Sequence, residues 1–413
     1  MERLIFHVDV NSAYLSWEAA RRVAKGEEDI RLIPSAIGGD REKRTGVVLA
    51  KSIPAKKLNI KTGEPISMAL RKCPELFLAK PDFSLYEENS KKFMNVCRKY
   101  APVVEKYSID ECFLDMSGTR KVYSDPVAIA IKIKNEIRDT LGFTVNIGIG
   151  TNKLLAKMAS DFEKPDKVHT LYREEIETKL WPLPVQELFS VGKATAERLG
   201  KMYITTIGDL AKADSRRVQS LVGIKLGQQI HEFANGIDNI PVLAEGEDAK
   251  GYSSSTTLEE DVRTTDEAYK ILLALADSVA LRMREDGAKA YCVSVTIRDG
   301  TFKNKSRQRK LMVPTNITSE IYSNVKKLFS ELWDKRTPLR LLGVSLTDLT
   351  REGHIQQSFF GNEEKEQNEK LDKAIDHIRK KYGLDTISRG SLLHSNVEVS
   401  KKYRAQMERK KEK

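Results

Sequence analysis

Two adjacent acids, Asp110 and Glu111, interrupt a segment that otherwise has the composition of two short β-strands. The segment reads EKYSIDECFLDMS and runs from Glu105 to Ser117. Neighbouring side chains on a strand point to opposite faces, but at the turn of a hairpin both can converge on one site. The two carboxylates are therefore candidate ligands for a cation, unless they are simply solvated turn residues.

A third carboxylate, Asp9, lies near the end of an apolar run at the amino terminus. The run LIFHVDV, residues 4–10, has the pattern of a buried strand. Three carboxylates on neighbouring strands suit a hard cation such as Mg²⁺, which prefers oxygen ligands. The sequence therefore predicts one cation site that contains Asp9, Asp110 and Glu111.

The composition indicates a polyanionic partner. The 413 residues include 70 Lys and Arg against 59 Asp and Glu, which gives a formal net charge of +11. With no signal peptide or apolar membrane span in the sequence, we expect a soluble cytoplasmic protein that binds nucleic acid. The four cysteines form no CxxC pair, which argues against a zinc site and against a disulfide framework. The length favours about two to four domains.

The order of the predicted elements brings the three acids together. After the first strand, Asn11 or Ser12 can cap a helix that ends before Gly26. The later patterns are a helix over 86–100, the hairpin over 103–117, a helix over 126–141, a strand over 143–150 and a helix over 152–162. This βαββαβ order, with an insertion after the first strand, is the split βαβ pattern, which sets the first strand beside the hairpin.

Several side chains near the acids have types that suit a nucleotide. Tyr14 falls on the first turn of the first helix, where its ring could lie under a sugar and collide with a 2′-hydroxyl. Three lysines in the insertion could supply point charges for phosphates: Lys51, Lys56 and Lys57. On the last helix, Lys153 and Lys157 lie four apart on one face, and Lys164 follows just beyond. The alternatives are a core tyrosine and a set of solvated lysines.

Two later segments favour contacts with nucleic acid. Residues 185–202 read as two helices joined by a tight hairpin at Val191 and Gly192, which would point backbone N–H groups at a phosphate unless it is an ordinary helical hairpin. A linker follows, and a second βαββαβ pattern runs from Tyr252 to Leu349. Its third strand carries cations at alternate positions: Lys303, Lys305, Arg307 and Arg309. A period of two puts these cations on one face, which predicts a nucleic-acid surface.

The last part of the chain reads as a tail. Phe359 and Phe360 follow Gln356 in polar surroundings, which is typical of a docking peptide. Residues 371–382 could form a short helix, and the basic end of the chain is expected to be disordered.

Four motifs, in this order, resemble the Y-family, or translesion, DNA polymerases. They are HVDVNSAY, YSIDECFLD, NIGIGTNKLLAKMASDFEKPD and SVGKATAERL. The resemblance covers about residues 1–350 and is strongest to the bacterial polymerase IV branch, whereas KTGEP in the insertion resembles polymerase V.

The resemblance implies an α+β multidomain fold. It has a ferredoxin-like βαββαβ palm, small fingers, a helical thumb with a helix-hairpin-helix, and a second βαββαβ unit called the little finger. The implied boundaries are palm 1–12 and 80–170, fingers 13–79, thumb 171–240, linker 241–250, little finger 251–350 and a flexible tail 351–413.

The implied activity is error-prone DNA-directed DNA synthesis across damaged templates, in DNA repair and replication. Two Mg²⁺ ions would activate a primer 3′-hydroxyl and neutralise the triphosphate, held by the three acids and the backbone carbonyl of Val10. By resemblance, Glu111 helps to hold the ion at the attacking oxygen, while Asp9 and Asp110 bridge both ions. No further domain is left for a proofreading nuclease.

The resemblance also assigns other site residues and partners. Tyr14 becomes the sugar-discriminating gate and Lys164 a triphosphate contact. The remaining assignments are Ala13, Ser52 and Lys56 for the nucleotide; Gly192, Lys193, Lys303, Lys305, Arg307 and Arg309 for DNA; and Gln356, Phe359 and Phe360 for a sliding clamp. The expected partners of this monomer are primer-template DNA, deoxynucleoside triphosphates and the clamp. Ala13, Ile53, Lys56 and, in the thumb, Ser190 depart from the polymerase IV pattern.

Two other functions stay open on the sequence alone. A palm-type nucleotidyl cyclase could share the carboxylates and the split βαβ order, but it has no use for the thumb hairpin. A non-catalytic DNA-binding homologue of a polymerase would explain the atypical residues of the fingers.

Overall fold

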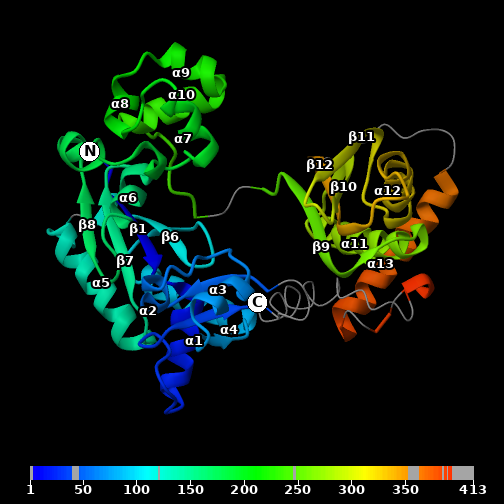
Figure 1. Cartoon of the computed structure of the whole chain (residues 1–413), viewed down its shortest axis with the longest axis horizontal. Coiled ribbons are helices and arrows are strands. Elements are labelled where there is room, and N and C mark those ends of the chain that lie inside the picture. Colours follow the sequence, from blue (N-terminus) through cyan, green and yellow to red (C-terminus); the bar gives the residue numbers. More distant parts are fainter. Residues whose placement is uncertain are drawn as a thin grey trace. The chain divides into compact units, whose positions relative to one another are not determined.

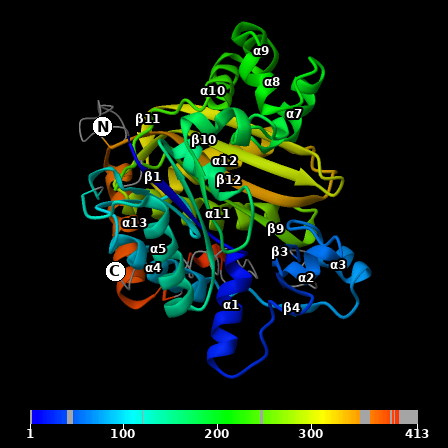
Figure 2. The same ribbon diagram turned by 90° about the vertical axis from the view of Figure 1, so that its left-hand side faces the viewer.

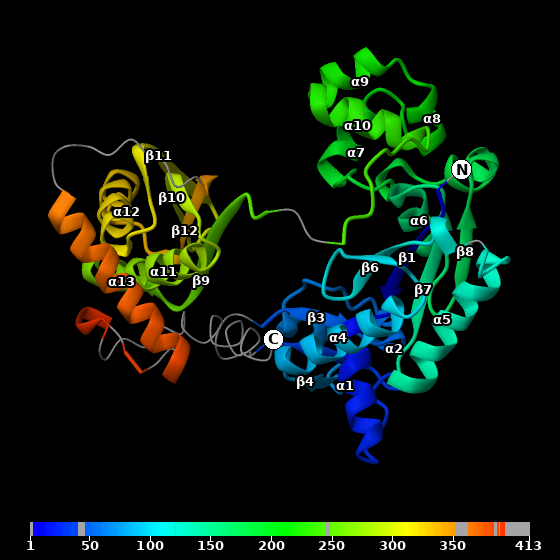
Figure 3. The same cartoon turned by 180° about the vertical axis from the view of Figure 1, so that it is seen from behind.

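The computed structural model describes residues 3–39, 46–119, 121–244, 248–351, 362–383, 386–387 and 389–392. The chain forms two compact units, one made of Met1–Gly39 and Val47–Gly246 and the other mainly of Glu247–Lys413. Three views show the elements of each unit, coloured along the sequence (Figures 1, 2 and 3). Each unit has its own sheet and its own core.

The first unit is built on a five-stranded sheet with the strand order β5-β6-β1-β7-β8. Its strands are β1 (Ile5–Val10), β5 (Val103–Lys106), β6 (Glu111–Asp115), β7 (Val145–Gly150) and β8 (Val168–Leu171). The central strand β1 pairs antiparallel with both β6 and β7, which confirms the predicted split βαβ pattern. The sequence did not predict β8, a short and polar strand that pairs parallel with β7.

Helices cover both faces of this sheet. They are α1 (Ala13–Ala24), α4 (Phe83–Arg98), α5 (Pro126–Leu141) and α6 (Lys153–Ser160). Phe6 and Val8 of β1 lie in one core cluster with apolar residues of α1, α4 and α5. The opposite face of β1 carries His7, which contacts Ser160 of α6. Because side chains alternate along a strand, Asp9 shares the α6 side with His7.

Glycines in β7 allow α6 to lie directly against the sheet. A Cβ atom on Gly148 would lie 1.9 Å from the backbone oxygen of Ala156. A Cβ atom on Gly150 would lie 2.7 Å from the backbone nitrogen of Ala156. Any other residue type would therefore push the helix away. The NIGIG sequence thus sets the distance between α6 and the acids on the neighbouring strands.

Helix α1 belongs to the core of the palm rather than to that of the fingers. Its Leu15, Trp17 and Ala19 are buried in the same cluster as the central strand. The fingers have a separate small core formed by α2 (Ile53–Lys57), α3 (Ile66–Lys72) and the sheet β3-β2-β4, with β2 (Ser35–Gly38), β3 (Val48–Lys51) and β4 (Phe77–Ala79). An amphipathic helix reads the same in either domain, and the palm–fingers boundary at residue 13 stays a prediction.

The segment predicted as the thumb is helical and packs on α6. Its helices are α7 (Lys193–Gly200), α8 (Ile207–Lys212), α9 (Ser215–Val222) and α10 (Ile224–Ala234), preceded by short turns at Arg173–Glu175 and Ile176–Leu180. Its core includes Leu154 and Leu155 of α6. The first helix of the predicted pair is only a 3-10 turn, Val185–Glu187, because the backbone is already extended at Leu188. Ser190 then has a left-handed φ of 74°.

The second unit repeats the βαββαβ order, as predicted. Its sheet has the order β11-β10-β12-β9, and α11 and α12 cover one face. The elements are β9 (Gly251–Val262), α11 (Thr265–Glu285), β10 (Lys289–Asp299), β11 (Asn304–Thr315), α12 (Thr318–Leu332) and β12 (Leu339–Thr350). Within the described ranges, no helix has both the length and the apolar composition that a membrane crossing requires.

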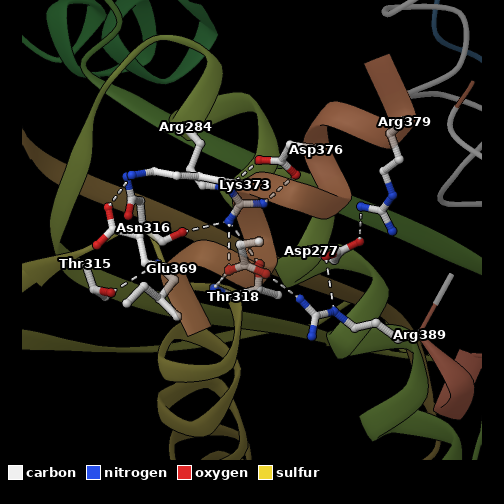
Figure 4. A network of polar contacts seen from close by, with 12 residues as sticks. Asp277, Arg284, Thr315, Asn316, Thr318, Glu369, Lys373, Asp376, Arg379 and Arg389 are labelled. Carbon is white, nitrogen blue, oxygen red and sulfur yellow. Dashed lines mark hydrogen bonds and ion pairs between the residues drawn. The ribbon is translucent and has the colours of Figure 1, made fainter. Parts of the chain in front are cut away.

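Part of the predicted tail is a docked helix, α13 (Asn362–Tyr382), which contains the short helix predicted over 371–382 and is longer. It is held on α11 by buried ion pairs, as Figure 4 shows. Asp372 of α13 lies 3.3 Å from Arg284 of α11, and Arg379 lies 2.7 Å from Asp277. The tail assignment is wrong for this helix, because charges that are buried in pairs look in the sequence like charges of a solvated segment.

Replacing Asp372 by Asn should destabilise the second unit by about 1.5–3 kcal/mol, because it removes the charged acceptor that Arg284 and Arg389 share. The two arginines keep Asp376 and Asp277 as their other partners. The Asp372 side chain is only 5% exposed, pairs with both Arg284 and Arg389, and accepts a hydrogen bond from the backbone of Thr318. Urea unfolding of the full chain measures the change. Lys373→Ala, at a neighbouring exposed position, is the control and should shift stability by less than about 0.5 kcal/mol. Equal stability of the two variants would contradict the assignment.

Candidate active site

The pairing of β1 with β6 sets two of the three acids directly opposite each other. Asp9 and Glu111 are register partners, so their side chains share one face of the sheet. The backbone nitrogen of Val10 donates to the carbonyl oxygen of Asp110 at 3.0 Å, which holds the hairpin turn against the end of β1. Asp9, Val10 and Asp110 line one cavity of about 760 Å³.

Asp9 is a desolvated carboxylate with one lysine beside it. Its Oδ2 lies 3.2 Å from Nζ of Lys164, and its side chain is 13% exposed. Burial raises the pKa of Asp9 to about 6, although the charge of Lys164 acts in the opposite direction. Removal from water therefore dominates over the ion pair. A carboxylate in this state gains from a nearby divalent cation.

Glu111 has the opposite electrostatic balance. Its Oε2 accepts hydrogen bonds from Nζ of Lys157 at 2.6 Å and from Nε2 of His7 at 3.2 Å. Burial alone would raise the pKa of this carboxylate, but the hydrogen bonds and charge of these partners outweigh it and lower the pKa to about 2. Glu111 is therefore held ionised. His7 is fully buried, and burial lowers its pKa. Because a carboxylate can only accept, the Nε2 atom of His7 is the donor in this contact.

Three carboxylates are suitable ligands for magnesium. In this structure, however, each carboxylate contacts a different side chain of the protein. Asp110 accepts a hydrogen bond from the hydroxyl of Ser108 at 2.6 Å, while Lys164 holds Asp9 and Lys157 holds Glu111. Among the described residues, no group of three or more His, Cys, Asp or Glu is gathered closely enough to hold a metal ion. All three side chains offer oxygen ligands, which a hard divalent ion prefers. Asp9 has one lysine beside it, Lys164, and a divalent ion would add further positive charge.

Asp9 and Asp110, but not Glu111, share their cavity with all five predicted nucleotide residues: Ala13, Tyr14, Ser52, Lys56 and Lys164. The ring of Tyr14 stacks on that of Tyr86 with centroids 4.6 Å apart. The hydroxyl of Ser52 caps α2 by accepting from the backbone of Ala55, and it donates to the carbonyl of Ile33. The hydroxyl of Ser52 therefore stabilises the local fold of the predicted fingers. The nucleotide contacts of Ser52, Ala13, Tyr14, Lys56 and Lys164 stay predictions.

Sequence reasoning missed His7 as a partner of Glu111. The signal was present, because His7 is a polar residue inside an apolar strand and precedes Asp9 by two positions, which puts both on one face. Lys157 was read only as part of a basic helix face. Its partner could not be chosen from sequence, since the choice depends on how closely α6 approaches the sheet.

The predicted DNA-binding residues lie in two places. Gly192 caps α7, and the side chain of Lys193 is 83% exposed. In the second unit, the register sets Lys305, Arg307 and Arg309 opposite Ile297, Val295 and Val293, on the side where the helices pack. Arg307 and Arg309 both pair with Glu331 of α12, at 2.8 and 3.0 Å. Three of the four predicted cations thus share a face of edge strand β11, whereas Lys303 lies before the strand, which begins at Asn304. Contact with DNA stays a prediction.

The predicted clamp-binding residues, Gln356, Phe359 and Phe360, lie outside the described residues.

Family models match most of the chain. A model described as the impB/mucB/samB family matches residues 8–161, and the C-terminal domain of that family matches residues 249–359. A third model, described as the thumb domain of DNA polymerase-iota, matches residues 186–238 between them. The matches cover parts of the predicted palm and thumb and the whole of the predicted fingers and little finger.

Curated relatives align along nearly their whole length. The DNA polymerase IV of Clostridium acetobutylicum is 46% identical over 396 residues, 95% of this chain and 99% of the relative. That of Clostridium kluyveri is 39% identical over 402 residues, with coverage of 95% and 99%, and DNA polymerase IV 1 of Bacillus subtilis is 35% identical over 402 residues, with coverage of 97% and 95%. A solved Y-family DNA polymerase chimera shares the fold, with a TM-score of 0.72 at 24% identity over 84% of this chain and 100% of the chimera. The chain therefore belongs to the Y-family DNA polymerases, in the branch of the bacterial DNA polymerases IV.

Proposed function

We propose that this chain is a DNA-directed DNA polymerase that extends primers across damaged template bases, with two magnesium ions and without proofreading. The observation that carries the proposal is one cavity that joins Asp9 and Asp110 to Tyr14 and Lys164. Its volume, about 760 Å³, lies in the range of sites for ligands the size of a nucleotide. The 46% identity to a DNA polymerase IV supports the same reading.

The three carboxylates would hold the metal ions, with the carbonyl oxygen of Val10 as a further ligand. Bound magnesium would activate the primer 3′-hydroxyl and neutralise charge on the triphosphate. The residues of the chain itself supply fixed positions for the reacting groups. The 3′-oxygen forms a bond to the α-phosphorus of the nucleotide while pyrophosphate leaves.

Lysines around the cavity would bind the triphosphate, since they supply positive charge without competing for the metal ligands. Lys51, Lys56 and Lys164 all line the cavity. Burial lowers the pKa of Lys51, and the nearby charge of Lys56 adds to this effect. A bound anion would stabilise the charged form of both lysines. Tyr14 would lie under the deoxyribose with Ala13 beside it, and Ser52 would line the nucleotide site.

The DNA duplex would be held by the thumb hairpin at Gly192 and Lys193 and by the cations of β11. The net charge of +11 and the exposed positions of Lys193, Lys303 and Lys305 support this assignment. We also propose that the chain acts as a monomer in the bacterial cytoplasm and that Gln356, Phe359 and Phe360 dock on a sliding clamp.

The two other functions have less support. A nucleotidyl cyclase would not need segments that match a polymerase thumb and a polymerase C-terminal domain. A non-catalytic homologue would have no reason to keep all three carboxylates, one of them desolvated at the edge of a large cavity.

Replacing Asp110 by Asn keeps the shape of the side chain and removes its charge. We expect kcat/KM for magnesium-dependent primer extension to fall by about 10³-fold or more, since a metal ligand contributes several kcal/mol to the transition state. Asp139→Asn, an exposed acid on α5, is the matched control and should retain activity. Extension by the Asp110 variant at the control rate would refute the proposed site.

Replacing Tyr14 by Ala should raise the incorporation of ribonucleotides relative to deoxyribonucleotides by about 10- to 100-fold, because the ring no longer meets the 2′-hydroxyl. Single-nucleotide insertion with matched dNTP and rNTP measures the ratio. Tyr14→Phe keeps the ring and should keep the selectivity. The gate assignment fails if Tyr14→Ala discriminates sugars as well as the Phe variant does.

A further inference from the structure

Lys157 of α6 is a fixed cation in contact with the carboxylate of Glu111. Its Nζ lies 2.6 Å from Oε2 of Glu111, and both side chains are largely buried, at 13% and 20% exposure. The same ammonium group lies 5.3 Å from the ring centroid of Tyr107 and 5.8 Å from that of Phe189. A cation between two aromatic rings and a carboxylate has little freedom to move. The ammonium group of Lys157 is thus held in one position beside the carboxylate of Glu111.

His7 holds the same oxygen from the other side. A carboxylate can only accept, so His7 donates from Nε2 to Oε2 of Glu111, and its Nδ1 faces the hydroxyl of Ser160 at 2.8 Å. The amide of Asn146 donates in turn to the carbonyl of Ser160 at 3.0 Å. The hydrogen-bond chain therefore runs from strand β7 through α6 and β1 to the acid on β6.

The two oxygens of Glu111 are treated differently by these contacts. Both donors bind Oε2. Among the described residues, Oε1 of Glu111 has neither a hydrogen-bond nor an ion-pair partner. One oxygen is thus used to orient the side chain, and the other remains for a ligand. Such a division is expected where outer partners orient a carboxylate that binds a metal.

We propose that Lys157 is a positioning residue for Glu111: it fixes Oε2 and thereby presents Oε1 to the divalent ion. This inference rests on the proposed polymerase function. It makes a prediction that runs against simple electrostatics. Removal of a positive charge near a cation site should strengthen cation binding by Coulomb's law. Loss of a positioning contact should weaken it, by about 10- to 100-fold for outer partners of metal ligands.

A neighbouring lysine gives a matched control. Lys153 lies one turn earlier on α6, its Nζ is 2.6 Å from Oε1 of Glu105, and the exposures of the two side chains are 13% and 14%. It also lies over an aromatic ring, that of Phe113, at 4.8 Å. Lys153 and Lys157 therefore have nearly the same burial and kind of partner, but only the partner of Lys157 is a proposed metal ligand.

The experiment measures Mn²⁺ affinity rather than activity. The full chain is bound to a dideoxy-terminated primer on its template with the matching deoxynucleoside triphosphate, so that no bond can form, and free Mn²⁺ is read by electron paramagnetic resonance. Lys157→Met should weaken Mn²⁺ binding by about 10- to 100-fold, whereas Lys153→Met should leave it nearly unchanged. Lys157→Gln retains a hydrogen-bond donor without the charge and should bind Mn²⁺ more tightly than Lys157→Met.

The inference is overturned if Lys157→Met and Lys157→Gln both bind Mn²⁺ as tightly as the unmodified chain or more tightly, since charge alone would then explain the effect. It is also overturned if Lys153→Met weakens binding as much as Lys157→Met. Thermal unfolding shows whether each variant is folded, and the Gln variant decides the question if the Met variant is not. Failure of the unmodified chain to extend a primer with Mg²⁺ would instead refute the proposed function.

Discussion

The antiparallel pairing of β1 with β6 is the constraint on which the rest of the first unit depends. It sets Asp9 opposite Glu111, two acids on one face of a sheet. Like charges in this position destabilise a sheet unless cations are nearby. The nearest resident cations come from α6 and the loop after it, as Lys157 and Lys164. Helix α6 can supply them only because Gly148 and Gly150 let it lie against β7.

The two acids are compensated to different degrees, and this difference has a chemical meaning. Glu111 is held ionised by Lys157 and His7, with its pKa lowered to about 2. Asp9 is desolvated, with its pKa raised to about 6 despite Lys164. A divalent cation would therefore gain most from Asp9, whose charge Lys164 compensates only in part, and would find Glu111 already oriented. Stability and function are coupled here, since the lysines that stabilise the fold lie beside the reacting groups.

Local patterns were enough to predict much of this arrangement. The split βαβ order predicts that Asp9 lies beside Asp110 and Glu111. The period-two pattern correctly predicts that Lys305, Arg307 and Arg309 share one face, although Lys303 precedes the strand. Pattern alone could not show that this face also carries α12, whose Glu331 pairs with both arginines. Nor could it show that α13 docks, because Asp372 and Arg379 read as solvated charges until their partners on α11 are known. What sequence fails to give is the identity of long-range partners.

The central claim is that this chain joins nucleotides to a primer on a damaged template. The most direct measurement is single-turnover primer extension by the purified full chain on paired undamaged and lesion-containing templates, with Mg²⁺ or with EDTA. We predict template-directed addition on both templates with Mg²⁺, no excision of a mismatched primer end, and no reaction with EDTA. Tight binding of the primer-template without any nucleotide addition in Mg²⁺ would contradict the account.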